Sequence, residues 1–189
     1  AQFTAKAIAT LDSYFAQSKP DFVVVQGDTN TVFAASLAAF YHKISVIHVE
    51  AGLRTGNKYS PFPEEMNRQI TGRLADIHFA PTEQSRRNLL NEGVKDECVF
   101  VTGNTVIDAL LYAKDKVDCI NDSQIEFLKT IVDNSKDLVL VTGHRRENFG
   151  DGFINICQAL KQLALDKNVQ IIYPVHLNPN VQKPVNEIL

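Results

Sequence analysis

The chain has 189 residues, enough for one large or two small domains with a real hydrophobic core. Apolar residues make up 44% and charged residues 22%, and 19 basic against 22 acidic residues give a net charge of -3. This composition is that of an ordinary globular protein. It provides no electrostatic basis for binding nucleic acid or an anionic membrane, and no apolar run approaches the roughly 18 residues of a membrane span.

In the first two thirds of the chain, helical patterns alternate with short apolar strands. The expected helices are 2–15, 31–41, 64–74, 83–92 and 105–116, and the expected strands are 22–26, 44–49, 77–80 and 99–101. Apolar strands separated by helices of about ten residues indicate βαβ units and a parallel sheet covered on both faces. The fold class is therefore α/β, with Rossmann-like parallel sheets.

A polar stretch over 117–136 then interrupts this pattern. Within it, Ser123 and Glu126 form a capping box for a helix that runs through Val132. Strands at 138–142 and 169–174, a helix at 153–165 and a last helix after the loop 176–180 follow. We expect two domains: 1–117 is the C-terminal part of a first Rossmann-like domain, and 118–189 is the start of a second.

The two ends of the chain look cut. Met66 is the only methionine, and the apolar pattern of Val181, Val185 and Leu189 is still running where the sequence stops. No capping residue or glycine closes that last helix. We therefore expect an internal piece of a longer protein, with both domains incomplete.

Acidic residues follow the predicted strands at the points where they end. Asp28 comes after the strand 22–26, Glu50 directly after the strand 44–49, and Glu64 begins a helix next to Glu65. In an open α/β sheet, ligands bind beyond the carboxyl ends of the strands, so these acids form a candidate reaction centre. Each also has a structural explanation: Asp28 would serve as a helix N-cap, and first-turn Glu residues stabilise the helix dipole. Glu50 is harder to explain in this way, because Glu is a poor turn residue.

Together the three acids favour the functional interpretation. Carboxylates crowded into a partly dry cleft push their proton affinities apart, so that one group gives a proton and another takes one. Arg54 and Arg68 are candidates for the counter-charge, although both also fit surface ion pairs.

The second domain presents His144 and Arg145 directly after a strand, within Gly143-His144-Arg145-Arg146-Glu147. Arginines followed by a helix start are suited to an anionic ligand. His176 has the equivalent position after the next strand, whereas His48 and His78 are expected in the core or at a sheet edge. Cys98, Cys119 and Cys157 are isolated, which indicates neither a metal site nor a redox motif and fits a cytoplasmic location.

Five motifs in order resemble the non-hydrolysing UDP-N-acetylglucosamine 2-epimerases of bacteria. They are Gly27-Asp28-Thr29, His48-Val49-Glu50-Ala51-Gly52-Leu53-Arg54-Thr55, Pro61-Phe62-Pro63-Glu64-Glu65-Met66-Asn67-Arg68, Thr102-Gly103-Asn104-Thr105-Val106-Ile107-Asp108 and Thr142-Gly143-His144-Arg145-Arg146-Glu147. The resemblance implies a two-domain glycosyltransferase-B-type fold with the substrate between the domains. It also implies interconversion of UDP-N-acetylglucosamine and UDP-N-acetylmannosamine by elimination and re-addition of UDP.

Carried over residue by residue, the resemblance makes Asp28, Glu50 and Glu64 the acid/base carboxylates. It makes His144 a substrate contact, and His176 a candidate contact for the activating substrate molecule that some bacterial members bind. It implies no metal or other cofactor, no nucleic-acid or membrane partner, and a homodimer of the full-length parent. Segments of the nucleotide site would lie outside residues 1–189, so we expect this piece to be inactive alone.

Other functions remain open at this point. A hydrolysing epimerase would release UDP and free N-acetylmannosamine, and a glycosyltransferase would need an acceptor. A non-catalytic sensor of nucleotide sugars would keep the cleft without the chemistry. Retention of three acids near an anionic ligand argues against the sensor, because binding alone does not need them.

Overall fold

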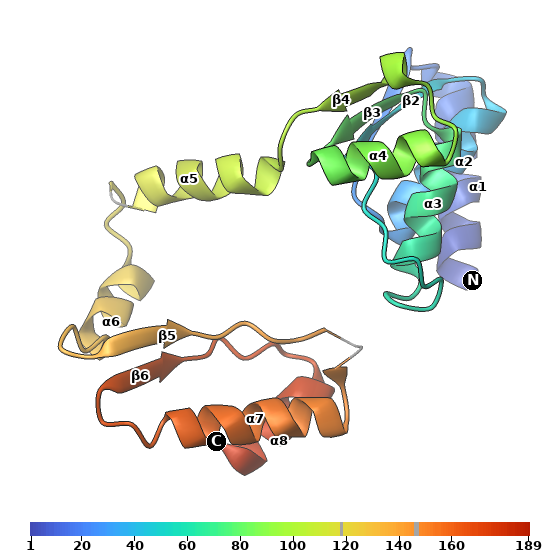
Figure 1. Cartoon of the computed structure of the whole chain (residues 1–189). Coiled ribbons are helices and arrows are strands. Elements are labelled where there is room, and N and C mark those ends of the chain that lie inside the picture. The colour runs from blue at the N-terminus through green and yellow to red at the C-terminus, as the bar shows by residue number, and fades with distance from the viewer. Residues whose placement is uncertain (118, 146–147) are drawn as a thin grey trace. The chain divides into compact units, whose positions relative to one another are not determined.

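The computed structural model describes residues 1–117, 119–145 and 148–189. It contains two compact units, Ala1–Asp115 and Lys116–Leu189, and each has a parallel sheet (Figure 1). The α/β class with Rossmann-like parallel sheets is confirmed. The division between the units falls inside helix α5 (Thr105–Val117), and the sequence-based domain boundary at 117/118 stays a prediction. Among the described residues, no helix is both long and apolar enough to span a membrane.

The sheet of the first unit has four parallel strands in chain order. They are β1 (Phe22–Gln26), β2 (Ser45–Val49), β3 (Ile77–Ala80) and β4 (Val99–Val101). Their register aligns Val25, His48, His78 and Val99 in one row across the sheet. Because the strands are parallel, their carboxyl ends meet at one edge, where Gly27 and Glu50 continue the chain.

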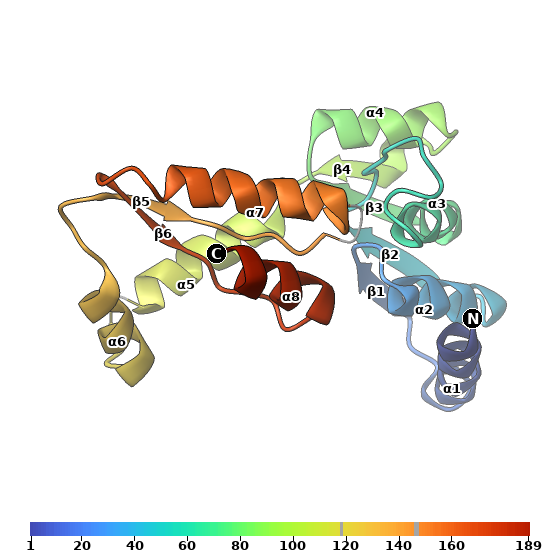
Figure 2. The ribbon, with the colours of Figure 1, turned by 90° about the horizontal axis from the view of Figure 1, so that it is seen from below.

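Besides most of α5, the first unit contains the helices α1 (Gln2–Ser18), α2 (Asn30–Tyr41), α3 (Glu64–Leu74) and α4 (Glu83–Asn91), and a short 3₁₀ helix covers Asp96–Cys98. The side chains that point from the sheet into the core belong to one face. Val25 and Val46 pack with Val32 of α2, whereas Ala80 and Val99 pack with Leu89 of α4. Figures 1 and 2 show the four strands side by side with these helices next to them.

The expectation of a sheet covered on both faces is wrong for the first unit. Phe22, Val24 and Phe100 on the second face are 55%, 64% and 49% exposed. The reason is topological, because parallel crossovers are right-handed. Strands that follow one another in simple order place every crossover helix on the same face, and strands β1 to β4 contain no reversal of order.

Local capping decides where the helices begin. Thr29, not Asp28, is the N-cap of α2, and its hydroxyl accepts the N–H of Val32 at 3.3 Å. Helix α6 (Ser123–Ile131) is capped by the carboxylate of Asp122, so the expected capping box on Ser123 is not what starts it. The Asp28 side chain is therefore not used as a helix cap and is available for other contacts.

The described part of the second unit contains a two-stranded parallel sheet and the helices α6, α7 (Asp151–Leu163) and α8 (Pro179–Ile188). Strands β5 (Asp137–Leu140) and β6 (Val169–Ile172) pair in register. Figure 1 shows α7 and α8 side by side beneath the two strands. Their contact buries Phe153, Cys157, Val181 and Val185 in an apolar core.

Candidate active site

The carboxyl end of β1 turns at Gly27, which has a φ of 79°. The Gly27 N–H donates to the carbonyl of Val49 at 3.0 Å, so the turn stays attached to the end of β2. The Gly27 carbonyl is 2.8 Å from Nε2 of the buried His48, which must carry the ring proton because a carbonyl only accepts. These contacts fix the point from which Asp28 leaves the sheet.

Glu50 has a φ of 64°, in the left-handed region that favours glycine. Its backbone is held there by the neighbouring ladder, because the N–H of Ala51 donates to the carbonyl of Phe79 at 3.0 Å. The Glu50 Oε2 lies 3.7 Å from the place where a Cβ on Gly27 would sit. Strained non-glycine residues gather at functional sites, and this one has its carboxylate beside the Gly27 turn.

Asp28 is partly buried and forms an ion pair with Arg68 of α3, with Oδ2 and Nη2 2.9 Å apart. Burial raises the pKa of Asp28, the Arg68 guanidinium lowers it, and the charge of Glu64 raises it again. The net direction is upward from the ordinary aspartate value. A carboxyl with a raised pKa is better suited to proton transfer near neutral pH than an exposed one.

Glu64 lies in the first turn of α3 and is partly buried. The negative charge of Glu64 raises the pKa of Asp28, so the two carboxylates lie close enough to interact electrostatically. Since Glu50 reaches the Gly27 turn, the structure brings Asp28, Glu50 and Glu64 to the same edge of the sheet.

The two candidate counter-charges, Arg54 and Arg68, have different partners. Arg68 contacts Asp28, whereas Arg54 forms a bidentate pair with Glu92, with Nε–Oε1 at 2.7 Å and Nη2–Oε2 at 2.8 Å. Arg54 therefore holds its own segment against the end of α4. Arg68 is the cation that faces the acids.

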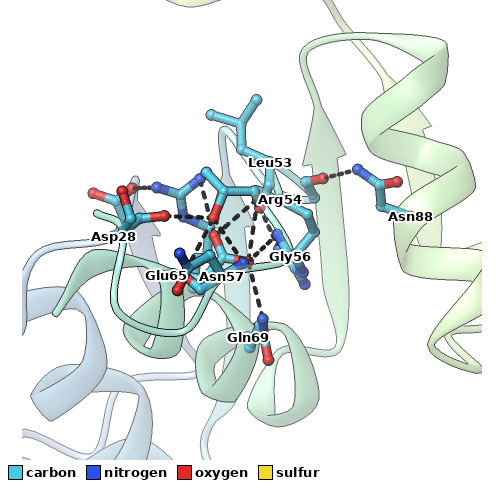
Figure 3. A network of polar contacts seen from close by, with 12 residues as sticks. Asp28, Leu53, Arg54, Gly56, Asn57, Glu65, Gln69 and Asn88 are labelled. Carbon is cyan, nitrogen blue, oxygen red and sulfur yellow. Dashed lines mark hydrogen bonds and ion pairs between the residues drawn. The ribbon is translucent and has the colours of Figure 1, made fainter. Parts of the chain in front are cut away.

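Sequence reasoning missed the role of Glu65 and Asn67. Glu65 is fully buried, and Figure 3 shows it at the centre of the polar contacts that join α3 to the loop 54–60. Asn67 donates from Nδ2 to the Asp28 carbonyl at 2.9 Å and to Asn30 Oδ1 at 3.0 Å. The signal was present in the sequence, because Arg68, Thr71 and Gly72 follow Glu65 at the spacing of one helical face.

The second unit presents a stacked pair of histidines. The rings of His144 and His176 are 5.0 Å apart and nearly parallel, at 15°, and both residues are exposed. His176 Nδ1 accepts the N–H of Asn178 at 3.0 Å, which leaves its proton on Nε2. The Gly143 carbonyl accepts from the Tyr173 hydroxyl at 2.7 Å, so the His144 loop is attached to the end of β6.

Arg145 is exposed and has interactions of its own. Arg146 and Glu147 of the same motif lie outside the described residues. Over the part of the chain that the structure describes, no group of three or more His, Cys, Asp or Glu side chains is arranged to hold a metal ion.

Comparison with known proteins assigns the family. The model of the UDP-N-acetylglucosamine 2-epimerase family matches residues 1–189, and this chain belongs to that family. A UDP-N-acetylglucosamine 2-epimerase of Salmonella typhimurium is 56% identical over 191 residues, which cover 100% of this chain and 51% of that protein. The Escherichia coli K12 protein of the same name is 54% identical with the same coverage.

Solved structures agree with this assignment. The UDP-GlcNAc 2-epimerase of Neisseria meningitidis bound to UDP-GlcNAc has a TM-score of 0.91 and 46% identity, over 98% of this chain and 51% of that one. An S. aureus MnaA–UDP structure has a TM-score of 0.88 and 45% identity, over 100% and 50%. These similarities agree with the expected glycosyltransferase-B-type class. The chain spans about half the length of the relatives it matches.

Proposed function

We propose that the full-length protein carrying this chain is a UDP-N-acetylglucosamine 2-epimerase. It interconverts UDP-N-acetylglucosamine and UDP-N-acetylmannosamine. Family membership supports the class of reaction. The observation that carries the proposal in this chain is the grouping of Asp28, Glu50 and Glu64 at one sheet edge, with Arg68 as their counter-charge.

The proposed reaction proceeds in two steps. A carboxylate takes the proton from C2 as the bond from C1 to the UDP oxygen breaks, giving a 2-acetamidoglucal and UDP. UDP then returns to C1 while an acid delivers a proton to the opposite face of C2. Elimination divides a difficult inversion into two proton transfers through one planar intermediate, for which positioned acids and bases are well suited.

Asp28, Glu50 and Glu64 act as the acid and base groups in this scheme. Asp28 and Glu50 also bind the sugar, and His144 and Arg145 contact the substrate from the second unit, with Arg145 suited to the diphosphate. His176 would contact an activating substrate molecule.

Deuterium incorporation at C2 tests the acid/base assignment. The full-length protein, incubated with UDP-N-acetylglucosamine in heavy water, is expected to exchange the C2 proton. Asp28→Asn, Glu50→Gln and Glu64→Gln should each reduce that exchange by about a hundredfold or more. Parental exchange in all three variants would refute the assignment. Release of free UDP in proportion to turnover would instead identify a hydrolysing enzyme, and binding without exchange would identify a sensor.

Two further expectations concern the state of the protein. Purified residues 1–189 are expected to be inactive, because they span about half the length of the relatives that they match. Turnover by this piece would overturn that statement. The full-length protein is expected to form a homodimer, and a monomeric mass in light scattering would contradict it.

A further inference from the structure

The first turn of α3 contains two neighbouring glutamates with different surroundings. Glu64 is partly buried near Asp28, whereas Glu65 is 0% exposed and faces the interior. A buried carboxylate is costly unless several donors surround it, so its partners show what it is used for.

The donors to Glu65 come mainly from the loop 54–60. The Thr55 N–H lies 3.2 Å from Oε1 and 3.1 Å from Oε2, the Gly56 N–H lies 3.2 Å from Oε1, and Gln69 Nε2 lies 3.0 Å from Oε1. The Thr55 hydroxyl in turn donates to the Ser60 carbonyl at 2.5 Å. The Glu65 carboxylate thus holds the N-terminal side of the loop 54–60, and the Thr55 hydroxyl closes the loop onto its other side. Figure 3 shows the contacts of Gly56 and Gln69 meeting at the Glu65 carboxylate.

A second set of contacts leads from Glu65 to the candidate catalytic acids. Arg68 Nη1 lies 3.6 Å from Glu65 Oε2, and Arg68 Nη2 lies 2.9 Å from Asp28 Oδ2. Arg68 is itself buried, with 9% exposure. Its guanidinium is therefore shared between a buried carboxylate and a candidate catalytic one, and its position depends on both.

We propose that Glu65 is a positioning residue, which ties the loop 54–60 and the Arg68–Asp28 pair to the helical turn that carries Glu64. This inference rests on the proposed function, because it gives Glu65 a part in placing the reacting carboxylates. Glu65 itself touches neither substrate nor reacting atoms.

The alternative is that Glu65 serves only the helix dipole, as first-turn acids commonly do. Glu83 of α4 shows what that role needs. It lies in a first turn and faces Arg86 three residues later at 3.6 Å, the same spacing and distance as Glu65 and Arg68. The Glu83 side chain is nevertheless 63% exposed. A glutamate in the first turn of a helix therefore needs neither the burial nor the loop contacts that Glu65 has. Glu83→Gln is the matched control for Glu65→Gln.

The proposal predicts opposite electrostatic effects from two variants. The charged groups that act on Asp28 are Arg68 and Glu64 of α3. Glu50, beyond β2, faces the neighbouring Gly27 turn, and His48 of β2 holds the Gly27 carbonyl. Glu65→Gln removes the second anion beside Arg68 but keeps the size of the side chain, so the Arg68–Asp28 ion pair remains and the pKa of Asp28 falls. Removing Arg68 raises it. A general loosening of the fold would not shift the pKa of Asp28 in opposite directions in the two variants.

The experiment compares Glu65→Gln, Arg68→Met and Glu83→Gln in the full-length protein. Carboxyl NMR titration follows Asp28, with Asp28→Asn identifying its signal. Amide hydrogen exchange follows Thr55 and Gly56. In Glu65→Gln we expect those two amides to exchange about tenfold to a hundredfold faster, because charge-assisted hydrogen bonds are lost. We also expect Asp28 to titrate lower in Glu65→Gln and higher in Arg68→Met, with Glu83→Gln parental in both measurements.

Catalysis supplies a third measurement. Misplacing reacting groups lowers kcat more than it raises KM, so Glu65→Gln should reduce kcat by about tenfold to a hundredfold. If Asp28→Asn keeps the parental rate of C2 exchange, the proposed role of Asp28 fails, but the NMR and amide measurements still decide the role of Glu65.

Parental protection of Thr55 and Gly56 in a folded Glu65→Gln, with an unmoved Asp28 titration, overturns the inference. Should Glu65→Gln not fold, Gln69→Leu provides a milder break. It removes one donor from the Glu65 carboxylate and keeps both charges. Its expected effect is about twofold to tenfold faster exchange of the same two amides, and unchanged exchange would again overturn the inference.

Discussion

The two units of this chain have different interiors. In the first unit, the buried side chains include Glu65, Arg68, His48 and His78. In the second unit, the core consists of Phe153, Cys157, Val181 and Val185, and the histidines of interest lie exposed on loops. The first unit thus uses part of its interior to hold polar groups in place, whereas the second builds a plain apolar support for a loop. Buried polar networks specify position, and apolar burial mainly supplies stability.

The largest expected effect comes from disrupting the apolar core of the second unit. Phe153 is 1% exposed at the contact of α7 and α8. Replacing it with alanine should destabilise the second unit by about 3–5 kcal/mol, through lost burial and an unfilled cavity. Chemical denaturation with amide exchange in α7 measures this. Phe127→Ala is the control, since Phe127 is 62% exposed and should change stability by less than about 0.5 kcal/mol. A similar loss in both variants would contradict the stated position of the core.

The next effect concerns the close packing behind the acids. A Cβ on Gly52, which has a φ of 88°, would lie 2.2 Å from the Ser85 carbonyl oxygen. Gly52→Ala should therefore destabilise the first unit by about 2–5 kcal/mol, from overpacking and left-handed strain together. Gly56→Ala is the control, because its φ is 76° but nothing lies within 4 Å of the added carbon. It should cost only about 1–2 kcal/mol in the same denaturation assay.

Acid should destabilise the polar interior through His48. Burial lowers the pKa of His48 to about 4, with the Gly27 hydrogen bond acting in the opposite direction. As the pH falls below about 6.5, the ordinary pKa of histidine, His48 becomes protonated in the unfolded chain but stays neutral in the folded protein. The folded protein therefore loses stability as the pH falls toward 4. The loss between neutral pH and pH 5 should be about 2 kcal/mol.

Unfolding free energies measured across that pH range test this effect. His48→Gln should have a flatter dependence on pH, although His78, whose pKa is also lowered mainly by burial, retains part of the slope. An unchanged slope in His48→Gln would show that His48 does not titrate in this way.

The smallest expected effect separates stability from function at one residue. Glu50→Gly relieves the left-handed strain at φ 64° and should stabilise the first unit by up to about 1 kcal/mol. The same change removes a proposed acid and should abolish C2 exchange. Lys43→Gly, at a φ of 56° away from the acids, should give a similar gain in thermal stability and keep activity. A destabilised Glu50→Gly would show that the Glu50 side chain supports the fold.

Much of the fold followed from local patterns in the sequence. Apolar strands between helices predicted the parallel sheets, because this alternation is typical of βαβ units. The prediction that helices cover both faces of the sheet was wrong. Which face a helix covers depends on the order of the strands in the sheet, and that order cannot be read from any single segment of the sequence. Among the candidate counter-charges, Arg54 and Arg68 looked equivalent until their partners Glu92 and Asp28 were seen.

By itself, the sequence determined that Asp28 and Glu50 would leave the sheet near the carboxyl ends of its strands. That outcome depends only on where an apolar run stops and an acid follows. The tertiary structure alone decided that Glu65, adjacent to Glu64, points inward and holds a loop and an arginine. Successive residues on a helix point about 100° apart, so the neighbours of each side chain are set by packing between distant segments.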